Sequence, residues 1–450
     1  MKGLNEKCHF IGVGGIGMSG LARILLQNKK QVSGSDIASN PIIKTLLAEG
    51  VNVQIGHSAS YIEPGMSVIY STDIAEGNAE FKAAKELSCN LLHRSELLQK
   101  IMAEYQAFTV SGTHGKTTTS SILAWMLTVA GLSPTYSIGG VVRGLSSNAN
   151  VGLGNYFVAE SCESDQSFLN YHPFGGIVTN IDFDHLSNYA SKDAQIQAFA
   201  KMMSQVASKE HLFWCGDDLN LAQINASGIK YGFNSNAMLR GSNFRQLGWK
   251  IVFDVSFEGK FYPSVEVALV GKHNALNALA VFGLALRLNV QEDLIREALS
   301  SFGGVLRRLE RKGSIQDCDV YDDYGHHPTE IEATIKGLRA AIGNKHLIVV
   351  YQPHRYSRAK ECIGLYKGAF HEVDALYITE IYAAGEKAIE GISQEGIIEE
   401  VKRDIGDLCQ GIKRSEVAVK LSPMICKPCV LLTLGAGDIH KLYDEINCFV

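Results

Sequence analysis

The sequence lacks any hydrophobic run long enough to cross a membrane. Its longest apolar stretches, such as residues 278–286, fall far short of the roughly 20 residues that a spanning helix needs. The first ten residues contain no apolar run of signal-peptide length, which argues against export. We therefore expect a soluble, cytoplasmic protein with no membrane partner.

A cysteine framework and an excess of positive charge are also missing. The ten cysteines follow no disulfide-framework spacing, which is typical of reduced thiols in a cytoplasm. One C-x-x-C pair, Cys426 and Cys429, has no second pair after it, so a metal or redox role there is a minor alternative. The formal net charge of -5 gives no basic surface, and nucleic acid is therefore not an expected partner.

The 450 residues contain no internal repeat and no low-complexity linker. The chain is nevertheless too long for one hydrophobic core of usual size, so several domains are expected. Short apolar runs, glycine-rich turns and helical stretches alternate along the chain, as is typical of α/β domains with parallel sheets. We expect three blocks, with boundaries at residues 1–107, 108–309 and 310–450. Within the middle block, the polar alternation of residues 244–266 predicts an antiparallel hairpin.

The expected elements follow from these runs. Helices are expected at residues 18–26 and 120–130. The expected strands are residues 9–13, 31–34, 107–110, 156–159, 176–179, 319–321, 347–351, 375–379 and 430–434.

The first glycine-rich turn follows the first expected strand and fits G-x-G-x-x-G from Gly12 to Gly17, with Asp36 after the second strand. Such a turn directs backbone N–H groups and a helix N-terminus at a diphosphate. Alone, it predicts an NAD-dependent dehydrogenase, or a tight turn without ligand. Because a stronger phosphate loop lies downstream, we expect it to hold the diphosphate of a nucleotide-linked substrate through Gly14, Gly15, Ile16 and Gly17.

A second phosphate loop, residues 111–119, lies between an expected strand and helix. Its backbone amides can surround phosphates, Lys116 can reach the terminal phosphate and Thr117 can bind Mg²⁺. This loop departs from the standard P-loop, because Val110 stands at the position of the first glycine. Two alternatives to an ATP site are an incidental sequence match and a P-loop that binds phosphate without catalysis. ATP contacts are expected at Gly112, Thr113, His114, Gly115, Lys116, Thr117 and Thr118.

Acidic side chains follow two further strands that should end at the same crevice. Glu160, Glu163 and Asp165 follow the first of these strands, and the second delivers residues 180–185, which end in Asp184 and His185. Carboxylate and imidazole from neighbouring loops are plausible ligands for Mg²⁺ or Mn²⁺. A solvated acidic loop is the alternative, particularly for Glu163 and Asp165.

The chain resembles the Mur ligase family in its shortened phosphate loop (residues 112–118), in the helix start G-x-H-N-x-x-N-A (residues 271–278) and in Arg307-Arg308-Leu309-Glu310. The resemblance extends over essentially the whole chain. It implies an α/β protein of three domains: an N-terminal Rossmann-like domain that binds UDP, a central ATP-binding domain similar to P-loop ATPases, and a C-terminal Rossmann-like domain.

Several residues acquire expected roles from this resemblance. Asn274 and Asn277 lie on one helix face, where their amides can form hydrogen bonds to an adenine edge. The alternative is that both side chains are simply solvated. Arg308 would stabilise charge on the transferring phosphoryl group. The alternative is that Arg307 and Arg308 are a basic pair on the protein surface without a role in the site. In the family, a glutamate and a histidine bind a second metal ion, and the matching residues here are Glu160 and His185. Nearby, Cys162 and Ser187 stand at positions where the family usually has acidic residues.

The third block contains Asp322-Asp323-Tyr324-Gly325-His326-His327-Pro328, which alone could be a metal site. The resemblance instead implies that Asp323 contacts ATP and that Tyr324 and His326 face an amino-acid pocket. Arg355 and Arg358 suit bidentate capture of that amino acid's carboxylate. In the first block, uridine or diphosphate contacts are expected at Ser35, Asp36, Ser71, Thr72 and Arg94.

The implied reaction is ATP-dependent joining of L-alanine to UDP-N-acetylmuramate through an acyl phosphate. Lys116, Arg308 and Mg²⁺ would neutralise the γ-phosphate, so that catalysis rests on positioning and charge stabilisation. The predicted catalytic residues are Lys116, Glu160, His185, Arg308 and His326. A ligase that recycles murein tripeptide and an NAD-dependent oxidoreductase are the alternatives, and closure of the third domain on ATP is expected.

Overall fold

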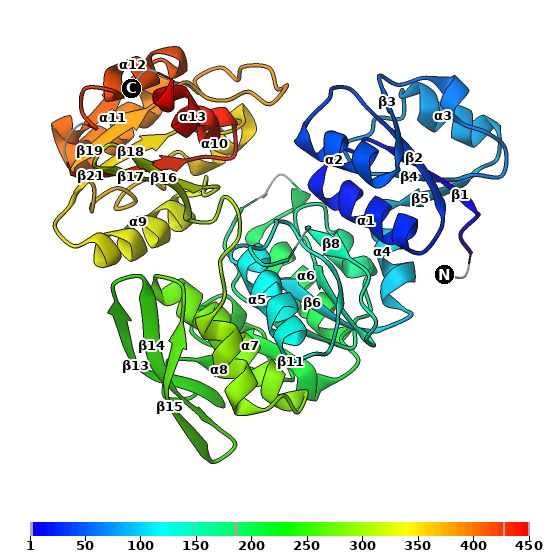
Figure 1. The fold of residues 1–450 in the computed structure, drawn as a ribbon, viewed down its shortest axis with the longest axis horizontal. Helices are drawn as coiled ribbons and strands as arrows, with labels where there is room; N and C mark the ends of the chain where they lie inside the picture. The colour runs from blue at the N-terminus through cyan, green and yellow to red at the C-terminus, as the bar shows by residue number, and fades with distance from the viewer. Residues whose placement is uncertain (1–2, 146, 185–187, 426–427, 449–450) are drawn as a thin grey trace.

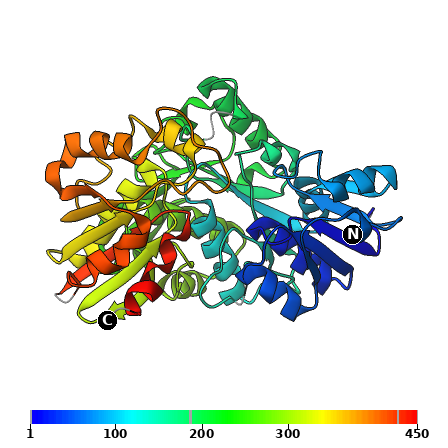
Figure 2. The same cartoon turned by 90° about the horizontal axis from the view of Figure 1, so that it is seen from above.

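The protein consists of three α/β domains, each built on its own sheet (Figure 1). The computed structural model describes residues 3–145, 147–184, 188–425 and 428–448. Seen from above, the first and third domains lie at opposite ends of the molecule, with the middle domain between them (Figure 2). Within the described part of the chain, no helix is both long and apolar enough to cross a membrane.

The first domain has five parallel strands in the order β3-β2-β1-β4-β5, which is the strand order of a Rossmann unit. The predicted first strand is confirmed, although it begins and ends two residues earlier than expected. Its elements are β1 (Lys7–Ile11), α1 (Ile16–Gln27), β2 (Gln31–Asp36), α2 (Pro41–Glu49), β3 (Asn52–Ile55), β4 (Ser67–Tyr70), α3 (Ala79–Glu86), β5 (Asn90–His93) and α4 (Arg94–Met102).

The middle domain has a ten-stranded sheet in the order β15-β14-β13-β12-β11-β10-β6-β9-β7-β8. The predicted antiparallel hairpin is confirmed and extends into a three-stranded meander, β13-β14-β15. The elements are β6 (Gln106–Ser111), α5 (Lys116–Val129), β7 (Thr135–Ser137), β8 (Ala149–Asn150), β9 (Tyr156–Glu160), β10 (Gly175–Val178), α6 (Lys192–Ser204), β11 (Leu212–Cys215), β12 (Ile229–Gly232), β13 (Leu239–Leu247), β14 (Lys250–Phe257), β15 (Lys260–Val267), α7 (Lys272–Arg287) and α8 (Glu292–Ser300).

The third domain has a six-stranded sheet in the order β16-β17-β21-β18-β19-β20, parallel except for β16. The four strands predicted here are confirmed. The elements are β16 (Glu310–Ile315), β17 (Cys318–Asp323), α9 (Pro328–Ile342), β18 (His346–Tyr351), α10 (Tyr356–Cys362), β19 (Ala375–Ile378), α11 (Gln394–Ile405), β20 (Cys409–Gly411), α12 (Val417–Leu421), β21 (Cys429–Leu434) and α13 (Leu442–Asn447).

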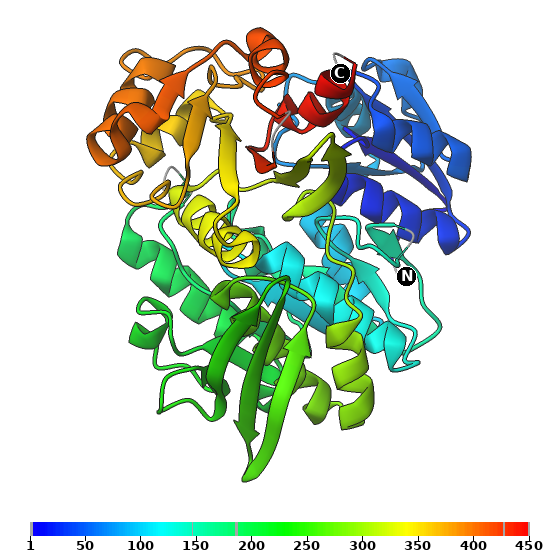
Figure 3. The ribbon, with the colours of Figure 1, turned by 60° about the vertical axis from the view of Figure 1, so that its left-hand side comes forward.

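Helix α9 of the third domain lies over the middle domain (Figure 3). Gln246 on β13 donates a hydrogen bond of 2.8 Å to the carbonyl of Gly337 on this helix. The Trp249 ring, in the turn after β13, stacks on the Tyr321 ring of β17 with centroids 4.8 Å apart. The third domain is therefore docked on the middle domain. The domain boundaries after residues 107 and 309 stay predictions, with β6 beginning at Gln106 and β16 at Glu310.

Candidate functional site

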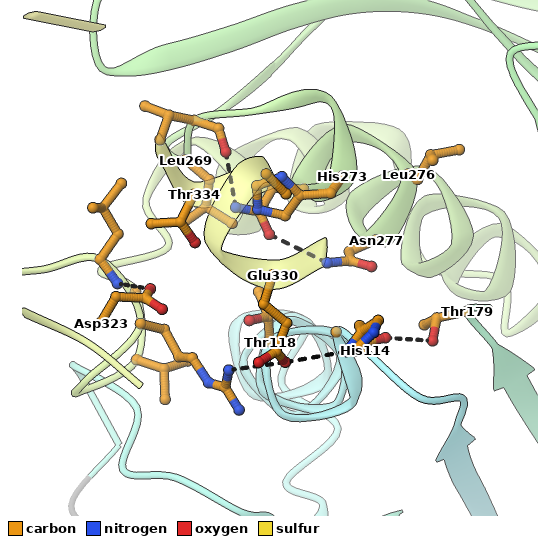
Figure 4. A pocket seen from close by; sticks show the side chains of 18 of the residues that line it. His114, Thr118, Thr179, Leu269, His273, Leu276, Asn277, Asp323, Glu330 and Thr334 are labelled. Atoms are coloured by element: carbon orange, nitrogen blue, oxygen red, sulfur yellow. Dashed lines mark hydrogen bonds and ion pairs between the residues drawn. The ribbon is translucent and has the colours of Figure 1, made fainter. Parts of the chain in front are cut away.

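A cavity of about 960 Å³ lies between the middle and third domains (Figure 4). Its walls are supplied by the turn before α5, the first turns of α7 and α9, and the segment that joins the two domains. The structure brings many of the predicted ATP contacts to it. These are His114, Gly115, Thr118, Asn274, Asn277, Arg308 and Asp323.

The predicted phosphate loop connects β6 to α5 and is held from the end of β10. The Thr179 hydroxyl donates to the His114 carbonyl at 2.6 Å, and the His114 amide donates to the Asn180 side chain at 2.9 Å. Gly115, the N-cap of α5, has a left-handed φ of 82°, a conformation that favours glycine. The helix begins at Lys116, earlier than predicted, so its first-turn amides are directed at the loop as a phosphate site requires.

The predicted ATP lysine is engaged by a carboxylate. Lys116 Nζ lies 2.7 Å from Glu163 Oε2 and also donates to the carbonyls of Gly112 and Thr113, at 2.6 and 3.0 Å. Glu163 is buried, so the solvated-loop alternative is wrong for this residue. Burial disfavours the charged lysine, but the charge and hydrogen bond of Glu163, together with the nearby Cys162 and Glu160, outweigh this effect and raise the pKa of Lys116.

Oxygen atoms suited to a hard cation gather beside the first turn of α5. Glu160 Oε1 accepts from the Gly139 amide at 2.6 Å and from the Ser120 hydroxyl at 3.4 Å. The same hydroxyl donates to the Thr117 carbonyl at 3.1 Å, which places Thr117 and Glu160 as neighbours. This donor set fits Mg²⁺. The third predicted ligand, His185, lies outside the described residues, as does Ser187.

The two predicted adenine contacts are not simply solvated. Asn277 is buried, and its Nδ2 donates to Asn274 Oδ1 at 3.2 Å. Asn274 Nδ2 in turn donates to the Val270 carbonyl at 2.8 Å. A Cβ atom on Gly115 would lie 3.0 Å from Asn277 Oδ1, so the asparagine pair sits directly beside the phosphate loop. Burial lowers the pKa of the neighbouring His273 to about 4.

A histidine of the phosphate loop connects the middle and third domains. His114 Nε2 lies 2.9 Å from Asp182 Oδ2, and His114 Nδ1 lies 3.3 Å from Glu330 Oε1 of the third domain. Asp182 also accepts from the Thr329 hydroxyl at 2.8 Å. Burial disfavours protonation, but the two carboxylates raise the pKa of His114 to about 9.

His327 completes this group, because its Nδ1 lies 3.5 Å from Asp182 Oδ2. Ligand atoms of His114, Asp182 and His327 lie within 4.8 Å of one another, and no other group among the described residues has this arrangement. Of the residues in the metal alternative at 322–328, His327 alone belongs to this group, and the other two members come from the middle domain.

The arginine pair is part of the site and not a plain surface feature. Arg307 donates to Asp322 at 3.2 Å and to the Gly435 carbonyl at 2.6 Å. Arg308 lines the cavity, and its guanidinium carbon lies 5.3 Å from the centre of the Tyr324 ring. Asp323 accepts from the Leu309 amide at 2.7 Å, and burial raises the pKa of this carboxyl to about 6. Asp323 thus anchors the segment between the domains.

Part of the predicted amino-acid pocket comes together behind the cavity. The rings of Tyr324 and His326 meet edge to face at 5.5 Å, and burial lowers the pKa of His326 to about 3. Arg358 Nε lies 3.8 Å from Asp184 Oδ1 of the middle domain. Arg355 is exposed at the start of α10, with a left-handed φ of 64°.

The first glycine loop is braced by β2. The amides of Gly12 and Val13 donate to the Ser35 carbonyl at 2.8 and 2.9 Å, and the Gly14 amide donates to Asp36 at 2.8 Å. Residues 15–17 are exposed at the N-terminus of α1. Ser35 is fully buried and its hydroxyl donates to Glu80 at 2.7 Å, so Ser35 supports the loop and offers no free atom for a nucleotide.

Two other predicted substrate residues lie at the junction of the first and middle domains. Asp165 Oδ2 accepts from the Thr72 hydroxyl at 2.9 Å and from the Arg94 guanidinium at 2.8 Å. Burial opposes ionisation, but the hydrogen bond from Ser167 and the charge of Arg94 lower the pKa of Asp165 to about 2. Ser71, next to Thr72, is half-buried after β4.

The sequence did not reveal three residues that organise these sites: Glu80, Asp182 and Glu330. Glu80 is completely buried and bonds His9, Ser35 and His57, at 2.7 to 3.0 Å. A signal existed for Glu330, which follows His326 by one helical turn, and for Asp182, which lies in the acidic segment before His185.

Comparisons with known proteins agree with this arrangement. Models of the Mur ligase family match the chain in three parts: its catalytic domain at residues 7–106, its middle domain at 110–285 and its glutamate ligase domain at 307–437. The UDP-N-acetylmuramate--L-alanine ligase of Protochlamydia amoebophila is 50% identical over 438 residues, which are 97% of this chain and 96% of that protein.

Solved structures share the architecture. The UDP-N-acetylmuramate-alanine ligase MurC of Thermotoga maritima superposes with a TM-score of 0.83 at 27% identity, over 98% of both chains. A murein peptide ligase of Psychrobacter arcticus has a TM-score of 0.70 at 22% identity over 99% of both chains, which shows a shared fold. From its family-model matches and its extensive identity to a known member, the chain belongs to the Mur ligase family.

Proposed function

We propose that this protein joins L-alanine to UDP-N-acetylmuramate and converts ATP to ADP and phosphate. The observation that carries the proposal is a pair of phosphate-binding loops in different domains. The loop of the first domain has no lysine, whereas the loop of the middle domain has Lys116 and opens on the interdomain cavity. An NAD-dependent oxidoreductase would use only the first loop and would leave this cavity without a role.

Extensive similarity to the Protochlamydia amoebophila ligase supports the choice of substrates. The exposed start of α1 would hold the diphosphate of the sugar nucleotide, since helix N-terminal amides favour anions. Asp36 and Arg94 would bind its uridine or diphosphate groups. Peptidoglycan precursor synthesis in the cytoplasm is the process in which this reaction would take part.

In the proposed first step, the lactyl carboxylate of UDP-N-acetylmuramate attacks the γ-phosphate of ATP, which gives an acyl phosphate and ADP. Lys116 and Arg308 stabilise the charge of the transferring group, while Asn274 and Asn277 hold the adenine. Thr117, Glu160 and His185 would bind Mg²⁺, which when present neutralises phosphate charge. No residue of the enzyme needs to form a covalent bond.

In the second step, the amine of alanine attacks the acyl carbon and displaces phosphate. Tyr324 and His326 would line the amino-acid pocket, and Arg358 would bind the carboxylate of alanine. Burial lowers the pKa of His326 to about 3, so its neutral ring would orient the incoming amine and would not hold the amine's proton. Positioning of the two substrates supplies the remaining rate enhancement.

The test is phosphate release with ATP, Mg²⁺ and UDP-N-acetylmuramate, scanned over free amino acids and short murein peptides. Release that depends on L-alanine supports the proposal. Release that requires a tripeptide assigns the protein to recycling of murein peptides, and tight NAD binding without ATP turnover overturns a ligase function altogether.

A further inference from the structure

Glu330, in the first turn of α9, lies where three parts of the proposed site meet (Figure 4). Its Oε1 atom lies 3.3 Å from His114 Nδ1 on the phosphate loop and 3.9 Å from an Arg308 nitrogen on the interdomain segment. Its Oε2 atom accepts a hydrogen bond of 3.2 Å from the His326 amide and lies 3.7 Å from His326 Nδ1.

Each oxygen of this carboxylate therefore faces a different site. Oε1 faces the residues expected around the phosphates of ATP, and Oε2 faces the residue expected beside the incoming amine. The side chain is only 14% exposed, so its contacts are little screened by solvent. Burial opposes its ionisation, but the hydrogen bond and charge of His114 and the charge of Arg308 hold the pKa of Glu330 below its usual value.

We propose that Glu330 is a positioning residue that couples the nucleotide site to the amino-acid site. This inference rests on the proposed function and goes beyond it. Through Oε1, Glu330 fixes His114 and Arg308 for the phosphates, and through Oε2 it fixes His326 for the amine. Because His114 belongs to the middle domain and Glu330 to the third, the contact exists only when the two domains are docked.

A consequence is that the amino-acid pocket is assembled only when the third domain is docked on the nucleotide site. A carboxylate is rigid, so a shift of Oε1 towards or away from the phosphate loop also moves Oε2 and the His326 backbone. Bound nucleotide should therefore raise the affinity for alanine, and alanine should raise the affinity for nucleotide by the same factor.

The chain offers a matched control on the same helix. Glu332 is half-buried, with a side chain 40% exposed, and pairs with Lys336, one turn further along α9, at 2.5 Å. A surface pair of this kind contributes little to stability. Glu332→Gln thus removes the same charge from the same helix without touching the three segments that Glu330 joins.

The experiment compares Glu330→Gln with Glu332→Gln in steady-state phosphate release. Glutamine keeps the size of the side chain and an acceptor for the His326 amide, but it removes the charge that holds His114 and Arg308. We expect Glu330→Gln to lower kcat about tenfold or more and to raise the KM for ATP and for alanine, as misplacement of reacting groups does. The KM for UDP-N-acetylmuramate, which binds the first domain, should stay unchanged.

Glu332→Gln should leave all four constants at their wild-type values. Glu330→Asp, which keeps the charge, should recover part of the lost kcat. If Glu330→Gln behaves like Glu332→Gln, or raises all three KM values equally, the positioning role is overturned. If Glu330→Gln does not fold, Glu330→Asp takes its place, and an amino-acid KM equal to the wild-type value then overturns the role.

A second readout separates this inference from the proposed function. Calorimetry measures binding of a non-hydrolysable ATP analogue with Mg²⁺, with and without alanine, and requires no turnover. If the wild-type protein releases no phosphate with alanine, the proposed reaction fails. Glu330 is still tested, because Glu330→Gln must bind the analogue several-fold more weakly than Glu332→Gln, and equal affinity overturns the inference.

Discussion

Lys116 and Glu163 form a buried ion pair, with Nζ 2.7 Å from Oε2, at the place where the phosphates of ATP are expected. A second pair lies close by, because Asp165, two residues after Glu163, holds Arg94 at 2.8 Å. One short acidic segment thus neutralises two cations that are expected to bind phosphate in different domains. All three donors of Lys116 are in use, so a phosphate that binds Lys116 has to replace one of its present partners.

Replacement of Glu163 by glutamine should therefore strengthen ATP binding. A hydrogen bond to a charged group contributes roughly 1.5–3 kcal/mol, so release of Lys116 from this pair is expected to lower the Kd for ATP about tenfold. Calorimetry with an ATP analogue measures the effect, and Glu210→Gln, at an exposed position, is the control. Weaker binding in Glu163→Gln would instead mean that Glu163 helps to hold the nucleotide or its metal ion.

Arg94→Ala should affect the sugar nucleotide selectively. Loss of a charge-assisted hydrogen bond to a phosphate is expected to raise the KM for UDP-N-acetylmuramate about tenfold or more, with no change in the KM for ATP. Arg403→Ala, an exposed arginine on α11, is the control. Equal rises in both KM values would show that Arg94 acts through the junction of the two domains and not through the substrate.

Local patterns predicted nine of the parallel strands and the helices after both glycine loops, but not all of their limits. The buried strands β18, β19 and β21 are short, mostly apolar runs, which is typical of parallel strands with both faces covered. The start of α5 was placed too late. Its first turn contains three threonines, which favour turns and caps over helix interiors, and here Gly115 and packing against the sheet determine the start.

Contacts between distant parts of the chain could not be predicted in the same way. Thr329 and Asp182 are hydrogen-bonded although 147 residues separate them, and Lys116 and Glu163 are 47 residues apart. Periodicity reports only neighbours on the same helix or strand. The sequence predicted which residues approach ATP, and it placed Glu163 among the acidic candidates, but not as the partner of Lys116. That pairing follows from how the strands of the middle domain assemble, whereas the contact of Glu330 with His114 follows from how the domains dock.

His114 predicts a pH dependence of stability. Its pKa is raised to about 9 in the folded protein, from an ordinary value of 6.5. Its bridge to Asp182 and Glu330 is therefore fully stabilising below about pH 6.5 and is lost as the pH rises through about 9. The wild type should melt at a higher temperature than His114→Gln at pH 7, and this difference should shrink towards pH 10. A difference that grows with pH would contradict a protonated His114.

Asn277→Ala should weaken discrimination between nucleotides. The side chain is buried beside Gly115, and an amide that reads adenine supplies a donor and an acceptor that alanine lacks. We expect the KM for ATP to rise about tenfold and the ratio of kcat/KM between ATP and GTP to fall, since unpaired polar groups are costly. Asn236→Ala, at an exposed position in the turn before β13, is the control. An unchanged ratio would place the adenine elsewhere.

The stack of Trp249 on Tyr321 provides a reporter for docking of the third domain. The rings are nearly parallel, at 13°, and join the turn after β13 to β17. If nucleotide binding closes the third domain, an ATP analogue with UDP-N-acetylmuramate should contract the molecule in X-ray scattering and change tryptophan emission. The chain has three tryptophans, so Trp249→Phe tests the source of the signal: it should remove the emission change and keep the contraction. Scattering curves that do not respond to both ligands would contradict closure, because the docked arrangement would then exist without them.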